Sequence, residues 1–351
     1  MNQITIKTSH PYDIFIGRGL LGQAGEYIRK ISRCKKAAII TDDIVASHYL
    51  KEVEGSLKQA GMETCAHIFP NGEASKCHAT LLEVYEFLTQ NELTRSDLIV
   101  ALGGGVVGDL AGFAAATYLR GIDFVQIPTT FLAQIDSSVG GKTAVDTPHG
   151  KNLVGAFHQP VLVLCDLDTL STLPDENFKD GVGEAIKYGM IKDAHLFEIL
   201  RKGECREHLL EVVTTCIDIK RAVVENDELD KGERMLLNFG HTVGHAVENH
   251  MNYQLTHGKC VGVGMAVITK AAAEAGIGSM EIYHAVKEAL KAYNMPYKLD
   301  IDYDTALNAC LSDKKRDRDE IRCILIRKIG EGYVSTMKAS DFKPFALKGV
   351  E

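Results

Sequence analysis

The chain has 351 residues, of which 45% are hydrophobic, and a formal net charge of −8. This length predicts about two globular domains of roughly 150 residues, each with a buried core. The acidic balance argues against a nucleic-acid or membrane-surface partner, because binding to a phosphate polymer or an anionic membrane needs a basic surface. No stretch approaches about 18 uninterrupted apolar residues, so we expect no membrane span.

The cysteines and the first residues bear on the cellular compartment of the protein. Nine cysteines are scattered along the chain without a C-x-x-C pair, which predicts neither a disulfide framework nor a thiolate zinc cluster. Residues 1–8 alternate in polarity like a strand and lack the apolar run of a signal peptide. We therefore expect reduced thiols in a cytoplasmic protein.

Up to about residue 172, short β-branched runs alternate with helical stretches. Strands are predicted at 37–40, 66–69, 98–102, 124–127 and 161–164. This alternation is typical of βαβ units. The pattern predicts an α/β, Rossmann-like domain with a mostly parallel sheet over residues 1–174.

After Leu173-Pro174 the pattern changes. The segments 184–200, 209–224, 241–250 and 261–275 have helical length and few strand signals, so residues 175–351 are predicted to form a mainly α-helical domain. Residues 321–327 and 333–337 are compatible with either a hairpin or an irregular tail. We expect the ligand site in the crevice between the domains, because open α/β sheets bind ligands at their strand ends.

A glycine turn follows the predicted strand at 98–102. Gly103, Gly105 and Gly108 satisfy G-x-G-x-x-G, and a helix is predicted at 106–118. Glycines allow a sharp turn and let a pyrophosphate reach the helix N-terminus. A tight turn without a ligand stays an alternative, and no acidic residue follows about 20 positions later to bind a ribose. The strand that follows, ending in Thr129 and Thr130, favours a nicotinamide dinucleotide.

A second glycine-rich segment begins at Asp136. It resembles a Walker A loop, but Asp136 occupies the position of the first glycine, so we reject an ATPase. We interpret Lys142 as a cation on a mobile loop, and 150–155 as a similar loop that carries Lys151 and Asn152. With other cations this set could bind a small phosphate or carboxylate, although each cation alone could equally be a surface charge. The additional cations are Arg120, Lys187, Lys220 and Arg234.

His241 and His245 are four residues apart, and Glu248 follows one turn later on the same predicted helix face. This spacing is common in metal sites, but core or capping histidines show it too. His257 and Glu184 are further candidate ligands. Two histidines and one glutamate are a usual set for catalytic Zn²⁺ or a similar ion. The spacing leaves open which histidines pair.

Several long blocks together resemble the 3-dehydroquinate synthase family of sugar-phosphate cyclases. The blocks are 103–109, 118–142, 151–155 and 237–246, and the match extends from about Thr41 to Lys314. The resemblance implies conversion of 3-deoxy-D-arabino-heptulosonate 7-phosphate to 3-dehydroquinate and phosphate, a step of the shikimate pathway. It also implies NAD and one divalent metal, Zn or Co, as cofactors, and a homodimer. NAD would be reduced and reoxidised within one turnover, around phosphate elimination, ring opening and aldol closure.

The same resemblance assigns residues to roles. It implies that Glu184, His241 and His257 bind the metal and that His245 contacts substrate, against the spacing argument. Substrate positions are Lys142, Asn152, Lys187, Lys220, Arg234, Asn238 and Lys314, and Arg120 resembles an arginine that reaches a neighbouring subunit's site. Lys315 lies beside Lys314 and is an alternative to it. Residues at or near NAD are Asp42, Glu73, Lys76, Gly104, Gly105, Val106, Asp109, Thr129, Thr130, Asp136, Lys142, Lys151, Thr172 and Leu173.

Three alternatives compete with this interpretation. A 2-deoxy-scyllo-inosose synthase resembles the family closely, but it typically has Glu at the position of Asn238. A metal-dependent polyol dehydrogenase has no phosphate to hold, so cations such as Lys142 and Lys187 would lack a role. A non-catalytic NAD- or metal-sensing protein would not need a complete catalytic set.

Overall fold

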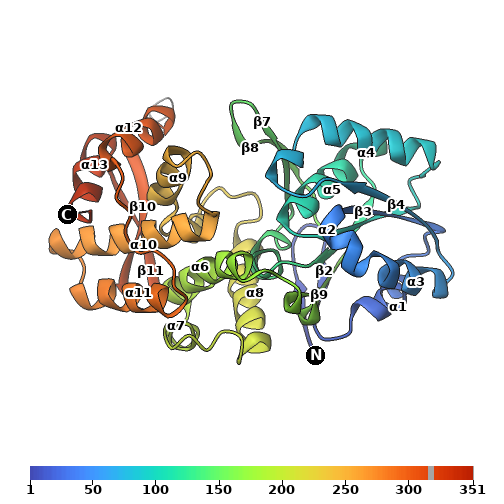
Figure 1. Ribbon diagram of the computed structural model, residues 1–351, viewed down its shortest axis with the longest axis horizontal. Coiled ribbons are helices and arrows are strands. Elements are labelled where there is room, and N and C mark those ends of the chain that lie inside the picture. The colour runs from blue at the N-terminus through green and yellow to red at the C-terminus, as the bar shows by residue number, and fades with distance from the viewer. Residues whose placement is uncertain (315–319, 351) are drawn as a thin grey trace. The chain divides into compact units, whose positions relative to one another are not determined.

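The structure is a computed structural model that describes residues 1–314 and 320–350, with the backbone alone at 309–314. Its contacts define two compact units (Figure 1). The first unit contains Met1–Pro174 and Lys220–Leu229, and the second contains Asp175–Ile219 and Asp230–Glu351. In the described part of the chain, no helix combines the length and apolarity needed to cross a membrane.

A seven-stranded sheet forms the centre of the first unit as far as the chain is described, in the order β1-β2-β9-β6-β5-β3-β4. The β1–β2 pair is antiparallel, and every other neighbouring pair in this order is parallel. This arrangement confirms the mostly parallel sheet, and each of the five strands predicted within it overlaps an observed one. The strands are β1 (Asn2–Ile6), β2 (Tyr12–Gly17), β3 (Lys36–Asp42), β4 (Glu63–Phe69), β5 (Leu98–Gly103), β6 (Asp123–Pro128) and β9 (Leu162–Asp166).

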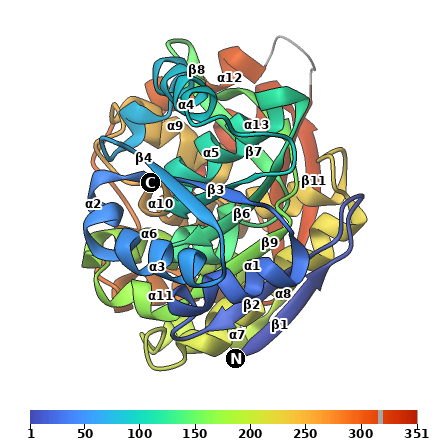
Figure 2. The ribbon, with the colours of Figure 1, turned by 90° about the vertical axis from the view of Figure 1, so that its right-hand side faces the viewer.

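Helices cover both faces of this sheet (Figure 2). Ala37 and Ile39 of β3 belong to the core that contains α1 (Ala24–Ile31) and α3 (Lys51–Gln59). The alternate residues Ala38 and Ile40 belong to the core that contains α4 (His78–Gln90) and α5 (Gly105–Thr117). Successive side chains of a strand point to opposite faces, so a strand buried on both sides needs this continuous apolar run. A short helix, α2 (Asp43–Val45), follows β3.

An antiparallel hairpin outside the main sheet corrects the loop prediction for this region. β7 (Lys142–Thr147) pairs with β8 (Gly150–Phe157), whereas the sequence had predicted mobile glycine-rich loops. The glycine serves the pairing, since a Cβ on Gly155 would lie 2.0 Å from the carbonyl oxygen of Thr143. The Thr143 hydroxyl also donates to the carbonyl of Ala156 at 2.9 Å. Lys142 and Asn152 therefore lie on paired strands.

The second unit is mainly helical, as predicted. Its central helix, α10 (His257–Glu274), packs against α6, α9, α11 and α13, and every residue from Cys260 to Thr269 is buried. β10 (Glu320–Lys328) and β11 (Glu331–Lys338) form a hairpin, which decides between the two alternatives for this segment. The other helices are α6 (Asp175–Lys192), α7 (Ala194–Arg201), α8 (Leu209–Asn226), α9 (His241–His250), α11 (Met280–Ala292), α12 (Tyr303–Lys314) and α13 (Ala339–Lys348).

The single helical segment expected at 184–200 is two helices. α6 ends at Lys192, and Asp193 is the N-cap of α7. The Asp193 carboxylate accepts the backbone N–H of Leu196 at 2.9 Å, which satisfies one of the open donors of a helix start. Lys192, Asp193 and His195 interrupt the apolar residues at this break, a signal that the prediction of one long segment passed over.

Candidate active site

The glycine turn of the first unit has space that a side chain at Gly103 or Gly104 would occupy. A Cβ on Gly103 would lie 2.5 Å from the Val107 side chain, and a Cβ on Gly104 would lie 2.9 Å from Thr130 Cγ2. Gly104 is the N-cap of α5 with a φ of −75°, so the glycines provide space rather than an unusual backbone. Gly104 has no side chain that could cap this helix, and its described first turn contains no acidic residue. Its first N–H groups therefore suit an anion such as a pyrophosphate.

Thr129 supports the same interpretation. Its backbone N–H donates to the carbonyl of Gly103 at 3.0 Å, which holds the end of β6 beside the turn. The residue is 4% exposed, and within the described part of the chain its hydroxyl has no hydrogen-bond partner. A buried hydroxyl without a partner is rare in proteins and points to a bound group. The residues present therefore fit a dinucleotide.

Lys76 connects the glycine-turn helix with the β7–β8 hairpin. Its Nζ lies 2.5 Å from Asp109 Oδ2 on α5 and donates to Asn152 Oδ1 on β8 at 2.6 Å. Burial alone would lower the pKa of Lys76, but the Asp109 carboxylate outweighs it and raises that pKa, so the side chain stays cationic. Because Asn152 accepts through its oxygen, its amide nitrogen is left to donate to an anion.

Asn152 has a left-handed backbone, with a φ of +56°, and its N–H donates to Asp146 Oδ1 at 2.8 Å. We expect Asn152→Gly to keep this backbone while removing the amide, because glycine adopts positive φ freely. This variant should show a raised KM for a phosphorylated substrate, together with some loss of thermal stability, because the buried Lys76 ammonium loses one acceptor. Asn152→Ala should in addition lose about 1 kcal/mol of stability, since alanine is strained at this φ. Steady-state kinetics and thermal unfolding of the two variants test this, and an unchanged KM in both would contradict it.

Asp136 and Lys220 form a second pair in the first unit. The Lys220 ammonium contacts the Asp136 carboxylate and donates to its backbone carbonyl at 2.7 Å. The segment Lys220–Leu229 is tied to the N-terminal strands, since the Glu225 and Glu228 carboxylates accept the backbone N–H groups of Lys7 and Ser9. Those bonds hold Lys220 close to the sheet although most of α8 belongs to the second unit.

The remaining predicted residues of the first unit lie near strand ends or in loops. Asp42 ends β3 and caps α2, and Glu73 lies 3.7 Å from the Lys151 ammonium. The Thr172 hydroxyl contacts the Tyr49 hydroxyl, and Leu173 follows it. Lys142 is exposed at the start of β7, and Arg120 is exposed with a φ of +69°.

Glycine contacts bring three helices of the second unit together. A Cβ on Gly258 of α10 would lie 1.9 Å from the Asp180 carbonyl of α6. A Cβ on Gly264 of α10 would lie 2.0 Å from the carbonyl of Gly240, the N-cap of α9. The helices can approach this closely only because these positions have no side chain. As a result, Glu184 of α6 meets the histidines of α9 and α10.

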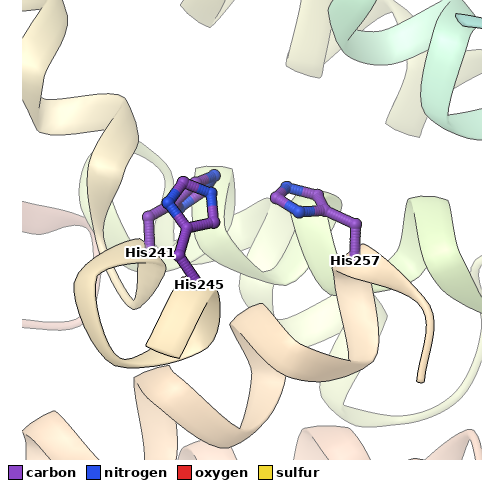
Figure 3. Close-up of side chains that lie close together, drawn as sticks. All are labelled: His241, His245 and His257. Carbon is purple, nitrogen blue, oxygen red and sulfur yellow. The ribbon is translucent and has the colours of Figure 1, made fainter. Parts of the chain in front are cut away.

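Four predicted residues converge here. His241 and His245 come from α9 and His257 from α10, and one nitrogen from each ring lies within 4.8 Å of the others (Figure 3). Glu184 Oε1 is 3.5 Å from Nε2 of both His241 and His257. Metal bonds of about 2.0–2.2 Å in a tetrahedral site place the ligand atoms roughly 3.4 Å apart. Glu184 is 1% exposed, and among the described residues its Oε1 has no hydrogen-bond partner. This arrangement fits a divalent metal.

The protonation states of Glu184, His241 and His257 also fit a divalent metal. Burial would raise the pKa of Glu184, but Lys187 and the nearby imidazoles hold it well below its usual range. Burial lowers the pKa of His241 to about 3, so that ring is neutral and has a lone pair that could bind a metal. Burial also disfavours a charged His257, but Glu184 and Glu248 outweigh it and raise its pKa to about 10. The site therefore favours positive charge between Glu184 and His257, where a metal ion would replace the proton.

The other predicted residues of the second unit are Lys187, Arg234, Asn238 and Lys314. Lys187 is buried and pairs with Glu184. Arg234 is 4% exposed and Asn238 is exposed, and both belong to a short helix, Glu233–Asn238, that precedes α9. Lys314 ends α12, but its side chain and all of Lys315 lie outside the described residues.

Two carboxylates lie outside the residue roles that the family resemblance assigned. Asp146 binds the backbone of Asn152, and Glu248 contacts His257. Glu248 was visible as a residue one turn after His245, whereas no pattern in one sequence marks Asp146.

Comparison with known proteins identifies the family. A model of the 3-dehydroquinate synthase N-terminal domain matches residues 66–180, and one of the C-terminal domain matches residues 181–316. A 3-dehydroquinate synthase of Clostridium botulinum is 46% identical, with 95% of this chain and 97% of the relative covered.

Two solved structures share the fold over nearly the whole chain. A 2-deoxy-scyllo-inosose synthase with carbaglucose-6-phosphate, NAD⁺ and Co²⁺ has a TM-score of 0.88 and 26% identity, covering 99% of this chain and 100% of that one. A 2-epi-5-epi-valiolone synthase of Streptomyces hygroscopicus with NAD⁺ and Zn²⁺ has a TM-score of 0.88 and 25% identity, covering 99% and 98%. From the domain matches and the near-complete coverage at 46% identity, the chain belongs to the 3-dehydroquinate synthase family.

Proposed function

We propose that the chain converts 3-deoxy-D-arabino-heptulosonate 7-phosphate to 3-dehydroquinate and phosphate, as a phosphate-eliminating lyase of the shikimate pathway. The observation that carries this proposal is the contact of Glu184 Oε1 with both His241 and His257, beside the buried Lys187. Such a set would suit a divalent metal, and the neighbouring cation would suit a phosphorylated substrate.

The cofactors would be NAD and one divalent metal, Zn or Co, which the two structural relatives also bind. The turn at Gly104 and Gly105, with Thr129, would hold the dinucleotide, and Glu184, His241 and His257 would hold the metal. When bound, NAD⁺ would accept and later return a hydride, and the metal would polarise a substrate hydroxyl.

The chain's own residues would bind and orient the substrate. Asn152 would donate its amide N–H to the phosphate, in the orientation that Lys76 sets. Lys187 is buried and its ammonium contacts Glu184, so it would be available to a phosphorylated substrate once a metal offsets the charge of Glu184. His245 is exposed on α9 beside the metal-binding rings, which suits a substrate contact. The leaving phosphate, held this way, would itself accept the substrate proton.

We also propose a homodimer in the cytoplasm that acts on a small phosphorylated sugar acid. The exposed Arg120, with its left-handed backbone after α5, would serve the site of a neighbouring subunit. Lys142, Lys220, Arg234 and Asn238 would complete the substrate contacts. Lys314 is proposed for the same role from the resemblance alone.

The direct test is phosphate release by the purified, metal-loaded chain. With the heptulosonate phosphate as substrate, we expect stoichiometric phosphate and 3-dehydroquinate at catalytic NAD⁺, without net NADH formation. Glucose 6-phosphate, the parent of the carba-analogue in the related structure, serves as the competing substrate. A folded, metal-loaded chain that releases no phosphate, or that prefers glucose 6-phosphate, would refute the proposal.

A further inference from the structure

Glu248 faces the histidine cluster from the buried side of α9. The residue is 6% exposed, and its Oε2 lies 3.4 Å from Nδ1 of His257 on α10. The same imidazole directs its other nitrogen, Nε2, to Glu184 Oε1 at 3.5 Å. One ring of the proposed metal site is therefore held between two carboxylates.

We infer that Glu248 is a positioning residue of the metal site, which accepts the Nδ1–H of His257 and thereby directs the lone pair of Nε2 to the metal. The inference rests on the proposed function for the presence of the metal. It concerns Glu248 alone, which would not itself be a ligand.

The tautomer explains why such a partner is needed. A neutral imidazole carries one proton, so a hydrogen bond from Nδ1–H leaves Nε2 unprotonated and able to bind a metal. His241 shows the same arrangement, because its Nδ1 lies 3.1 Å from the carbonyl oxygen of Phe239. Both rings therefore direct Nε2 to the same Glu184 oxygen. They differ in their acceptors, since Phe239 offers a neutral carbonyl and Glu248 a carboxylate.

The charge of Glu248 matters because Lys187 offsets that of Glu184. These two residues form a buried ion pair, so together they contribute no net charge to attract a dication. Asp180 is the other carboxylate near His257, and it accepts the backbone N–H of Gly258 at the start of α10. Glu248 is thus the carboxylate that places negative charge directly on the imidazole and makes it a more basic ligand.

The position of Glu248 follows from helix geometry. It lies three residues after His245 and seven after His241, which places all three side chains on neighbouring faces of α9. The backbone N–H of Tyr253 donates to the Glu248 carbonyl at 3.0 Å where the chain turns towards α10. This turn brings His257, the first residue of α10, back beside Glu248.

The test measures metal affinity of the full chain, without an activity assay. Wild type, Glu248→Gln and Glu248→Ala would be stripped with a chelator and titrated with Co²⁺ and Zn²⁺ against a chromogenic chelator. Because outer-shell partners change metal affinity by about 10–100-fold, we expect the alanine variant to bind about 100-fold and the glutamine variant about 10-fold more weakly. Glutamine keeps an acceptor but loses the charge. Glu274→Gln, an exposed position at the end of α10, is the matched control and should match wild type.

Two further measurements separate positioning from a structural role. The thermal stability of the metal-stripped glutamine variant should equal that of stripped wild type, and the Co²⁺ absorption spectrum of the alanine variant should differ from the wild-type spectrum. Equal affinities in wild type and both variants, or weaker binding that only follows unfolding, would overturn the inference while leaving the proposed function standing. A wild-type chain that binds no metal would overturn both.

Discussion

Replacing His257 with alanine is expected to give a folded chain that retains no metal after dialysis and has lost its activity. The physical reason is that His257 directs Nε2 to the space beside Glu184 Oε1, and its removal leaves only two of the proposed ligands, Glu184 and His241. The loss of affinity should exceed the roughly 10–100-fold effect of an outer-shell partner. His245→Ala is the matched change, and it should keep the metal while losing activity.

Metal content of the dialysed variants and phosphate release after metal addition distinguish the two outcomes. The ring nitrogens of all three histidines lie within 4.8 Å of one another, so a three-histidine set is geometrically open to a metal. If His245→Ala loses metal as completely as His257→Ala, that set holds the ion and the assignment of Glu184 is wrong.

The parallel sheet was predictable because burial on both faces leaves a strong signal. Every residue of β5, from Leu98 to Gly103, is buried, and its sequence is an uninterrupted apolar run that ends in glycine. The same physics explains α10, which is long, central and buried at every residue from Cys260 to Thr269. An element that is buried on most sides has a long apolar run, and such a run can be recognised in a single sequence.

The β7–β8 hairpin was mispredicted because its signals are ambiguous. β8 is largely exposed, and it contains Gly150 and Gly155, which normally indicate a loop. The need for a glycine there comes from the approach of the opposite strand at Thr143, and that contact is not visible in either segment alone. The break at Asp193 was missed because it spans only one residue between two helices, so the segment keeps helical length and composition on both sides.

For the histidine cluster, the sequence predicted which residues belong to it but not that they lie close together in the fold. The spacing of His241 and His245 places both on one helix face, and His257 begins another helix. Whether Glu184 reaches them depends on how closely α6 and α10 approach, which periodicity does not encode. This approach depends on glycines such as Gly258 and Gly264, which no motif in the sequence marks as contacts between helices.

Gly258→Ala is therefore expected to have the second large effect. The added Cβ would lie 1.9 Å from the Asp180 carbonyl oxygen, which is backbone and cannot rotate away, so α6 and α10 must separate. Overpacking of a core typically costs about 1–3 kcal/mol, and a clash with backbone belongs at or above the upper end. Because the clash lies one residue from His257, the displacement should also move its ring away from Glu184 and weaken metal binding.

Gly55→Ala is the control for this change. Gly55 lies within α3, and a Cβ there would meet nothing within 4 Å, so alanine should stabilise the chain by about 0.5–1 kcal/mol through helix propensity. Denaturant unfolding and metal titration of both variants measure the two effects. Since both substitutions add one methyl group, a loss of stability and of metal affinity in Gly258→Ala alone would show that the backbone contact between α6 and α10 shapes the metal site. A Gly258→Ala chain with wild-type stability and metal affinity would mean that the helices can separate without moving the ligands.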